Sequence, residues 1–238
     1  MEYFFTPPEK IQKDFLFIEN DEAKHLTRVL RKIVGDTIWV TDGLDNSYEV
    51  VIRAIHHELV ECEIVRHFFR KNESWLNLTL AFSVLKNPSR NDWIIEKGTE
   101  IGIRNFIPIF TSRTISQSAK EERWQQIALS AMKQSCRSYQ PKISSAKDFN
   151  ELLIEKNNYD LKLIPHEQTD RILFVSEVIR FQQKAKEILV VIGPEGGFSN
   201  EEILSAEKNN FIQVSLGRRR LRSETAAIVS STLILGSH

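Results

Sequence analysis

Two glycine-containing segments in the last third of the chain combine residue types that could bind a ligand. The first, Gly193-Pro194-Glu195-Gly196-Gly197, directly follows the apolar run Ile188–Ile192. Such a run predicts a buried strand, and Ser199 with Glu202 predicts the capped start of a helix. Open α/β sheets bind ligands where a strand ends before a helix, and glycines let the backbone approach a ligand closely.

A tight strand-to-helix turn without a ligand would account for the same glycines. A phosphate is disfavoured, because the segment has neither the Lys-Ser/Thr of a phosphate loop nor a GxGxxG pattern. Glu201 and Glu202 would also place two carboxylates in the first turn of the helix. Negative charge there competes with a bound phosphate for the positive end of the helix dipole.

The second segment, Ile212–Ala227, also predicts a strand, here followed by Gly217 and a helix that begins near Ser223. Four arginines lie in the connecting loop: Arg218, Arg219, Arg220 and Arg222. Neighbouring cations repel one another, so the cluster suits an anionic partner such as an RNA backbone. The alternative is a solvated loop whose charge is partly neutralised by Glu224.

The elements that must position these segments alternate between strand and helix. Expected strands are Leu76–Ser83, Phe106–Phe110, Leu161–Pro165, Ile188–Ile192 and Ile212–Leu216, and expected helices include Arg90–Gly102 and Lys120–Tyr139. This alternation predicts an α/β fold with a mostly parallel sheet covered on both faces.

Residues 1–72 predict a separate β-rich domain, and residues 73–238 the α/β domain. A helix over Asp21–Ile33, capped by Asn20 or Asp21, would bury the spaced apolar residues Leu26, Val29, Leu30 and Ile33. Its other face carries the basic side chains Lys24, His25, Arg28, Arg31 and Lys32. Short strands over Thr37–Thr41, Ser47–Ile55 and Leu59–Val65 suggest a small barrel, and His67–Trp75 reads as a linker.

Composition restricts the remaining possibilities. The chain has 238 residues with 32 basic and 32 acidic side chains, so any RNA surface must come from local clustering. Its two cysteines, Cys62 and Cys136, are far apart, and no metal site is expected. The longest mostly apolar stretch, Thr225–Leu235, is shorter than the roughly 20 residues that span a bilayer. We expect a soluble, cytoplasmic protein without membrane association.

Five ordered motifs resemble the RsmE family of 16S rRNA (uracil-N3)-methyltransferases, which belongs to the knotted SPOUT superfamily. Three match the family's patterns: Gly193–Ser199, His25–Arg31 with Gly35-Asp36, and Gln134-Ser135-x-Arg137. Two depart at one position each. The segment Leu216–Ala226 has Arg220 where the family has an aliphatic residue, and the segment Lys86–Gly102 has Gly98 where it has alanine. The resemblance covers nearly the whole chain.

The resemblance implies a C-terminal domain with a deep trefoil knot, preceded by a PUA-like barrel that binds RNA. It implies that the knot loops bind S-adenosyl-L-methionine, largely through backbone groups, and that two chains form a homodimer. The implied cofactor-binding residues are Pro165, His166, Glu167, Gly193, Pro194, Glu195, Gly196, Gly197, Leu216, Gly217, Leu221, Arg222, Ser223, Thr225 and Ala226.

The implied reaction transfers a methyl group to N3 of a uridine in 16S rRNA of the small ribosomal subunit. The N3 proton must leave, so a base or a cation beside the uracil oxygens is needed. Arg219 and Arg222 are the candidate cations, and Glu195 and Glu224 the candidate bases, although each carboxylate has an equally good structural explanation. Candidate RNA contacts are Arg28, Arg31, Lys32, Lys86, Arg90, Arg137, Arg218, Arg219 and Arg220.

Three other functions remain open from the sequence. The chain could be a knotted methyltransferase for another RNA, such as a ribose hydroxyl or a tRNA base. It could be an RNA-binding ribosome-assembly protein that keeps the fold without turnover. It could also be a nucleotide- or phosphate-binding enzyme, against which the missing phosphate-loop lysine counts.

Overall fold

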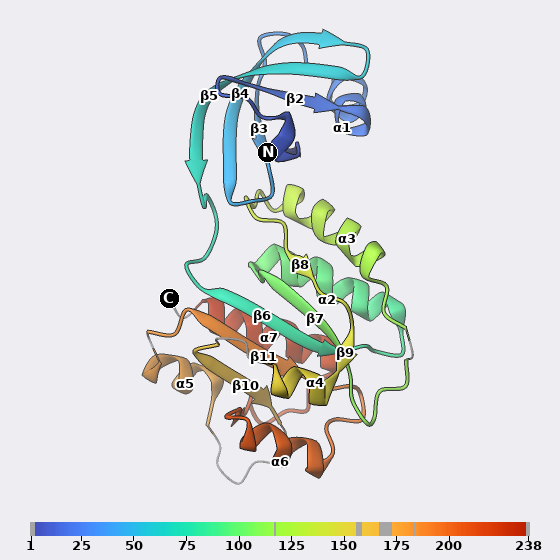
Figure 1. Cartoon of the computed structure of the whole chain (residues 1–238), viewed down its shortest axis with the longest axis vertical. Helices are drawn as coiled ribbons and strands as arrows, with labels where there is room; N and C mark the ends of the chain where they lie inside the picture. The colour runs from blue at the N-terminus through green and yellow to red at the C-terminus, as the bar shows by residue number, and fades with distance from the viewer. Residues whose placement is uncertain (1–2, 117, 156–158, 167–172, 183, 237–238) are drawn as a thin grey trace. The chain divides into compact units, whose positions relative to one another are not determined.

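The computed structural model describes residues 3–236 apart from 117, 156–158, 167–172 and 183 (Figure 1). The chain forms two compact units. The first comprises the residues up to Glu73 together with Leu129–Gln140, and the second comprises Ser74–Ala128 and the residues from Pro141 onward. A division of the chain near residue 72 remains a prediction.

The first unit is a five-stranded sheet around its own core. Its strands lie in the order β1 (Tyr3–Phe5), β3 (Thr37–Thr41), β4 (Asn46–His56), β5 (Leu59–Phe69) and β2 (Phe15–Glu19). The β1–β3 pair is parallel and the other pairs are antiparallel. The three strands expected from the sequence are confirmed. Strands β1 and β2 and the 3-10 turn Pro8–Lys10 between them were not expected from the sequence.

The core of this unit lies on one face of the sheet and includes the sulfur of Cys62, which is fully buried. Burial raises the pKa of the Cys62 thiol to about 12, so this thiol stays protonated at neutral pH. A protonated, inaccessible thiol is a poor nucleophile and a poor metal ligand. Cys62 therefore contributes packing to the barrel and no chemistry.

The expected helix over Asp21–Ile33 is wrong in its second half and in its cap. Helix α1 covers only Asn20–Lys24, its N-cap is Glu19 without a side-chain cap, and a π-helical turn follows over His25–Val29. The wider turn ends where Arg31 adopts a positive φ of 53°. Leu26 is buried as expected, whereas Val29, Leu30 and Ile33 are 65%, 40% and 65% exposed.

The expected linker over His67–Trp75 is also wrong, because two parts of it are structured. Strand β5 continues to Phe69. Glu73 is buried and forms an ion pair with Arg137, in which Arg137 Nη2 lies 2.7 Å from Glu73 Oε2. Arg137 is thus the buried partner of a carboxylate, and its expected role as an RNA contact is wrong.

The second unit is a parallel sheet in the order β12 (Ile212–Val214), β10 (Leu161–Pro165), β11 (Glu187–Ile192), β6 (Asn77–Ser83), β7 (Asn105–Phe110) and β8 (Lys142–Ile143), with β9 (Lys147–Asp148) also pairing with β7. Its strand pairs are all parallel. The five strands expected here are confirmed, and β8 and β9 are additional. The expected parallel α/β sheet is therefore present.

Helices cover both faces of this sheet (Figure 1). They are α2 (Pro88–Ile101), α3 (Glu121–Gln134), α4 (Phe149–Ile154), α5 (Val175–Phe181), α6 (Asn200–Lys208) and α7 (Ser223–Leu235). Alternate residues of each central strand serve two cores. One core packs α2, α5, α7 and the start of α3 against side chains such as Leu80 and Val190, and the other packs α4 and α6 against Ala81 and Val191.

Packing explains why glycine stands at position 98, where the family has alanine. An added Cβ would lie 2.8 Å from two atoms of the Phe106 ring and 2.9 Å from Cδ1 of Ile103. All three residues are buried. The ring of Phe106 therefore occupies the space that an alanine methyl group would need, and the departure is a matter of core packing.

The Gly98→Ala variant is expected to lower the free energy of unfolding by about 1–3 kcal/mol, although alanine favours helices over glycine by roughly 1 kcal/mol. The steric overlap outweighs that preference, because both neighbours are held inside the core. Chemical denaturation measures the change. Adding Phe106→Leu should restore part of the loss, and equal stability of the Gly98→Ala variant and the wild type would contradict this account.

Candidate active site

Three loops expected to bind the cofactor follow the neighbouring strands β12, β10 and β11. Because these strands are parallel, their carboxyl ends lie at the same edge of the sheet. Pro165 ends β10, and the backbone N–H of His166 donates to the carbonyl of Val214 at 3.0 Å. Glu167, also expected in the site, lies outside the described residues.

The loop after β11 is a tight turn that depends on its glycines. The N–H of Gly197 donates to the carbonyl of Pro194 at 2.9 Å, and Gly197 has a φ of +69°. At Gly193 an added Cβ would lie 2.9 Å from the ring of Phe198, which is buried. Side chains at these two positions would therefore deform the loop, for a backbone reason at Gly197 and a steric reason at Gly193.

Two contacts fix the loop to its surroundings. Arg113 Nη1 donates to the carbonyl of Gly196 at 2.8 Å. Glu195 is exposed, and its Oε1 accepts the backbone N–H of Lys86 at 3.2 Å. The satisfaction of a backbone N–H was the structural alternative to a catalytic role for Glu195, and this alternative is present in the structure.

The expected capping box at the start of α6 is confirmed. Ser199 Oγ accepts the N–H of Glu202 at 3.2 Å, and Glu202 Oε2 accepts the N–H of Ser199 at 2.8 Å. The second oxygen of Glu202 accepts the N–H of Ser112 at 2.8 Å. A buried carboxylate thus connects the glycine loop to the segment that follows β7.

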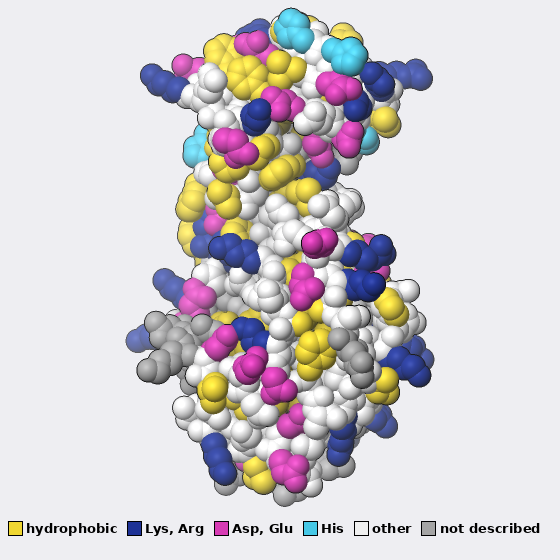
Figure 2. All heavy atoms as spheres, turned by 45° about the vertical axis from the view of Figure 1, so that its right-hand side comes forward, with side chains coloured by type: hydrophobic (Ala, Val, Ile, Leu, Met, Phe, Trp, Pro, Cys, Tyr) yellow, Lys and Arg dark blue, Asp and Glu magenta, His cyan; other side chains and the backbone are white. Residues whose placement is uncertain are grey.

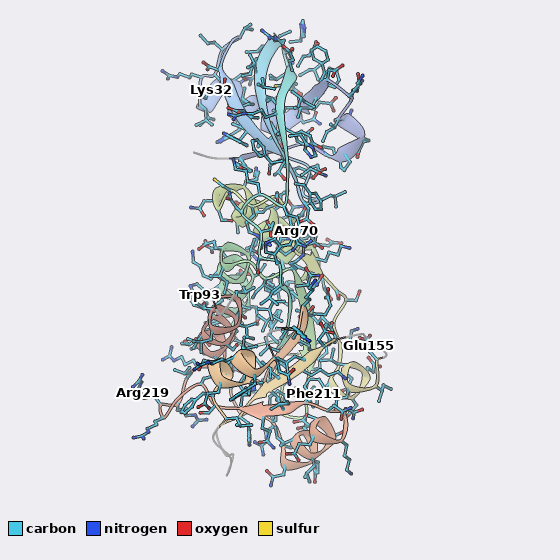
Figure 3. All side chains as sticks on the ribbon, turned by 90° about the vertical axis from the view of Figure 1, so that its left-hand side faces the viewer. Lys32, Arg70, Trp93, Glu155, Phe211 and Arg219 are labelled. Atoms are coloured by element: carbon cyan, nitrogen blue, oxygen red, sulfur yellow. The ribbon has the colours of Figure 1, made fainter. Side chains whose placement is uncertain are left out.

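The loop after β12 begins with Gly217, whose φ is +114°. All four arginines that follow it, Arg218, Arg219, Arg220 and Arg222, are exposed. Figure 3 shows Arg219 extending away from the ribbon. Arg220, the departure from the family pattern, is an exposed side chain, so a charged residue in its place costs no burial of charge.

Glu224 lies in the first turn of α7, and its side chain is only 12% exposed. Its Oε1 is 3.5 Å from Nε of Arg90, near the start of α2. Its Oε2 is buried and has no hydrogen-bond partner among the described residues. The partner that satisfies such an oxygen is commonly a water, an ion or a ligand.

The other expected RNA contacts come from both units and differ in exposure. Lys86 is exposed, whereas the guanidinium of Arg90 is engaged by Glu224. In the first unit Arg28 and Arg31 are exposed and Lys32 is half-buried. On the face shown in Figure 2, basic side chains are interspersed with acidic ones, which agrees with the balanced net charge.

Sequence reasoning missed Arg113 and Asn91. Asn91 is buried, and its side chain clamps the end of the loop after β6: its Oδ1 accepts the N–H of Leu85 at 2.9 Å, and its Nδ2 donates to the carbonyl of Leu85 at 3.0 Å. Each is a single polar residue without a local pattern. Their partners are backbone groups, 83 residues away for Arg113 and 6 for Asn91.

Within the described residues, no helix is long and apolar enough to cross a membrane. No group of three or more His, Cys, Asp or Glu side chains in this part of the chain is placed to hold a metal ion.

Comparison with known proteins decides the family. A model of the RNA methyltransferase domain matches residues 72–235, and a model of the RNA methyltransferase PUA domain matches residues 18–65. Ribosomal RNA small subunit methyltransferase E of Mesomycoplasma hyopneumoniae is 36% identical over 71% of this chain and 73% of its own length. The protein of the same name from Bacillus subtilis is 28% identical over 91% and 88%.

The chain belongs to the ribosomal RNA small subunit methyltransferase E family. A crystal structure of a family member from Neisseria gonorrhoeae, bound to S-adenosyl methionine, aligns with a TM-score of 0.85 at 28% identity. It covers 97% of this chain and 95% of its own. The fold of this methyltransferase is accordingly the knotted SPOUT fold with an N-terminal PUA domain, as the motifs predicted.

Proposed function

We propose that this protein transfers a methyl group from S-adenosyl-L-methionine to N3 of a uridine in 16S rRNA of the small ribosomal subunit. The observation that carries the proposal is the meeting of three loops, two of them glycine-dependent, at the carboxyl edge of β10, β11 and β12. Family membership supports the same reaction. Its location in the cytoplasm remains a prediction.

The loops suit a cofactor that is held by backbone groups. At Gly197 and Gly217 the backbone has a positive φ, and no atom lies within 4 Å of the place where a Cβ would stand. Glycine is therefore needed there for conformation, and it leaves space beside the main chain. The remaining expected cofactor residues, Leu221 to Ala226, lead directly from this loop into α7.

When bound, S-adenosyl-L-methionine supplies an electrophilic methyl group on its sulfonium. The residues of this chain must position the uracil in line with that methyl group and deal with the N3 proton. Arg219 and Arg222 are exposed on the loop that follows β12, where they can stabilise the negative charge that develops on the uracil oxygens.

Of the two candidate bases, Glu224 is the better supported. Glu195 is exposed and accepts a backbone N–H, whereas Glu224 is nearly buried and keeps one oxygen without a partner among the described residues. A carboxylate that is shielded from water and has an unsatisfied oxygen is a suitable proton acceptor. We therefore assign removal of the N3 proton to Glu224. Arg90 orients the carboxylate of Glu224.

The test uses labelled S-adenosyl-L-methionine with small ribosomal subunits from a strain that lacks the activity. Nuclease digestion and mass spectrometry should place the label on N3 of a single uridine in 16S rRNA. Label found only on tRNA or on a ribose would show that the protein methylates a different RNA or a different atom. Failure to bind the cofactor would favour the role of an assembly protein without turnover.

RNA binding by the first unit is assigned to its basic tip, defined as residues 28–34. The tip combines three basic side chains with exposed aliphatic ones: Arg28, Val29, Leu30, Arg31, Lys32, Ile33 and Val34. Basic side chains neutralise phosphates, and exposed aliphatic groups can pack against unstacked bases. Exposed aliphatic groups are more favourable in contact with a binding partner, here folded RNA, than in contact with water.

The Arg31→Glu variant is expected to weaken binding to 16S rRNA about tenfold, because one phosphate contact is replaced by repulsion. Cofactor affinity should not change, since the tip belongs to the first unit and the cofactor loops to the second. Filter binding at several salt concentrations measures the effect. Lys13→Glu, another exposed lysine of the first unit, serves as the control, and an equal loss in both variants would remove the tip from the interface.

We further propose a homodimer that uses the outer surface of α2 and α7. These two helices run side by side in the same direction, since Arg90 pairs with Glu224 at one end and Gly102 approaches Leu235 at the other. Trp93 on α2 is 39% exposed, and Figure 3 labels it. A large aromatic residue at the surface is characteristic of the centre of a protein interface.

The Trp93→Glu variant should therefore sediment as a monomer at concentrations at which the wild type is a dimer. Truncation of a central aromatic commonly costs an interface about 2 kcal/mol or more, and an added charge increases that cost. Leu204→Glu, which changes a 56% exposed residue of α6, should leave the dimer intact. A wild-type monomer, or loss of the dimer in both variants, would contradict this interface.

A further inference from the structure

A pocket of about 350 Å³ lies between the first turns of α2 and α3, in the second unit. Its walls come from the loops that follow β6 and β7, so it opens at the same edge of the parallel sheet as the cofactor loops. Residues that line it include Leu85, Pro88, Ser89, Ser118, Lys120 and Trp124. Among the described residues, none of those expected to bind the cofactor lines this pocket.

One part of the lining is apolar. Pro88 is exposed and contributes aliphatic surface, whereas Leu85 and Trp124 are each 1% exposed and close the pocket from below, with the indole ring of Trp124 packed against Phe82. Three serines, Ser89, Ser116 and Ser118, also line the pocket. Apolar surface with a few polar groups is the usual composition of a site for a small organic ring.

The charges of the pocket favour an anion. Asp92 is neutralised on two sides: Arg123 donates to both of its oxygens, with Nη2 at 2.8 Å from Oδ2, and Trp124 Nε1 donates to Oδ1 at 3.1 Å. Lys120 is exposed at the same rim, and its side chain forms no ion pair or hydrogen bond with the described residues. The lining therefore retains about one positive charge, next to the N-terminus of α2.

The pocket is connected to the cofactor loop through the backbone. Leu85, in the pocket wall, is clamped by the buried side chain of Asn91. The next residue, Lys86, donates its N–H to Glu195 in the Gly193–Gly197 loop. On the other side of the pocket, the segment after β7 contributes Arg113, which donates to Gly196 in that loop. A ligand in the pocket would thus lie beside the cofactor loop.

We propose that this pocket holds one nucleotide of the RNA substrate, with its base against Pro88 and its phosphate at Lys120. The assignment rests on the proposed function and adds a substrate subsite to it. A nucleotide combines the flat ring and the single negative charge that the lining accommodates. Trp124 and Asn91 keep the walls in place, and Asp92 orients Arg123 toward the rim.

The first experiment measures methylation of small subunits by the Lys120→Glu variant. Its KM for the subunits should rise about tenfold, with a salt dependence reduced by about one phosphate contact, and its affinity for S-adenosyl-L-methionine should stay within about twofold. Lys208→Glu, an exposed lysine on α6, is the matched control and should behave as the wild type. An unchanged KM for Lys120→Glu would overturn the proposal.

A second measurement separates this subsite from the proposed function. Binding of uridine 5′-monophosphate is followed by the tryptophan fluorescence of the whole protein, with and without Ser118→Phe, which should fill the exposed rim of the pocket. Wild-type binding that is lost in both Ser118→Phe and Lys120→Glu supports a nucleotide site even if subunits are not methylated. Methylation that both variants perform with wild-type KM would place the RNA elsewhere and leave the enzyme assignment intact.

Discussion

The Glu73→Ala variant is expected to lose about 3–5 kcal/mol of unfolding free energy, the largest effect on stability that we expect from a single side chain in this protein. Removal of the carboxylate leaves the guanidinium of Arg137 buried without its counter-charge, since the two side chains are only 1% and 3% exposed. A loss of this size corresponds to most of the stability of a marginal domain.

The structural reason is that one carboxylate satisfies four donors. Glu73 Oε1 accepts Arg137 Nε at 3.2 Å, the N–H of Ser138 at 3.0 Å and the N–H of Tyr139 at 3.1 Å, while Oε2 accepts Arg137 Nη2. These bonds hold the segment after α3 within the first unit. Alanine would leave all four donors buried, and each buried unsatisfied group adds its own cost.

Chemical denaturation with amide exchange at Ser138 and Tyr139 tests this account. Glu63→Ala is the matched control, because Glu63 also pairs with an arginine, Arg53, but both side chains are exposed. Its loss should stay below about 1 kcal/mol. A double variant, Glu73→Leu with Arg137→Met, should be more stable than Glu73→Ala alone. Similar losses for Glu63→Ala and Glu73→Ala would show that burial of the pair is not what matters.

The pair also shows which features the sequence could predict. The strands of the parallel sheet and the capping box at Ser199 depend on contiguous residues, so the local pattern was sufficient to predict them. Glu73 and Arg137 lie 64 residues apart, and each is a charged residue of a type that is usually exposed in loops. The pattern therefore indicated a linker at one position and an RNA contact at the other.

The basic tip illustrates a different limit. The spacing of Leu26, Val29, Leu30 and Ile33 is that of a buried helical face, yet a π-helical turn replaces the second half of the helix and leaves three of these residues exposed. Periodicity describes an ideal α-helix and contains no information on a local change of pitch. π-Helical turns are frequent at functional sites, which agrees with the RNA-binding role assigned to the tip.

The positions of the cofactor loops could be predicted from the sequence, but the environments of their side chains could not. Glycine and strand patterns placed Gly193, Gly197 and Gly217 at strand ends, and in the structure Gly197 and Gly217 have a positive φ. The two carboxylates, in contrast, were equivalent in the sequence. Only the fold places Glu195 at the surface and Glu224 beside Arg90. The Arg90–Glu224 pair joins α2 to α7, two helices that are separated by more than half of the chain.

The Glu224→Gln variant is accordingly expected to lower kcat by about 10²–10⁴-fold, the range attributed to a general base. Glutamine keeps the size of the side chain and an oxygen that can accept from Arg90, but it cannot take a proton. Cofactor affinity, measured by calorimetry, should change little. Single-turnover methylation of small subunits reports the chemical step directly.

The pH dependence distinguishes proton removal from a purely structural role. If Glu224 removes the N3 proton, the rate of Glu224→Gln should rise steadily with pH, because hydroxide can replace the missing base, while the wild-type rate levels off. Glu195→Gln is the control: its amide oxygen can still accept the N–H of Lys86, so its kcat should remain near that of the wild type. A Glu224→Gln variant with wild-type kcat and reduced stability would make the Arg90–Glu224 pair a structural link between α2 and α7. Equal losses of kcat in both variants would return the base to the Gly193–Gly197 loop.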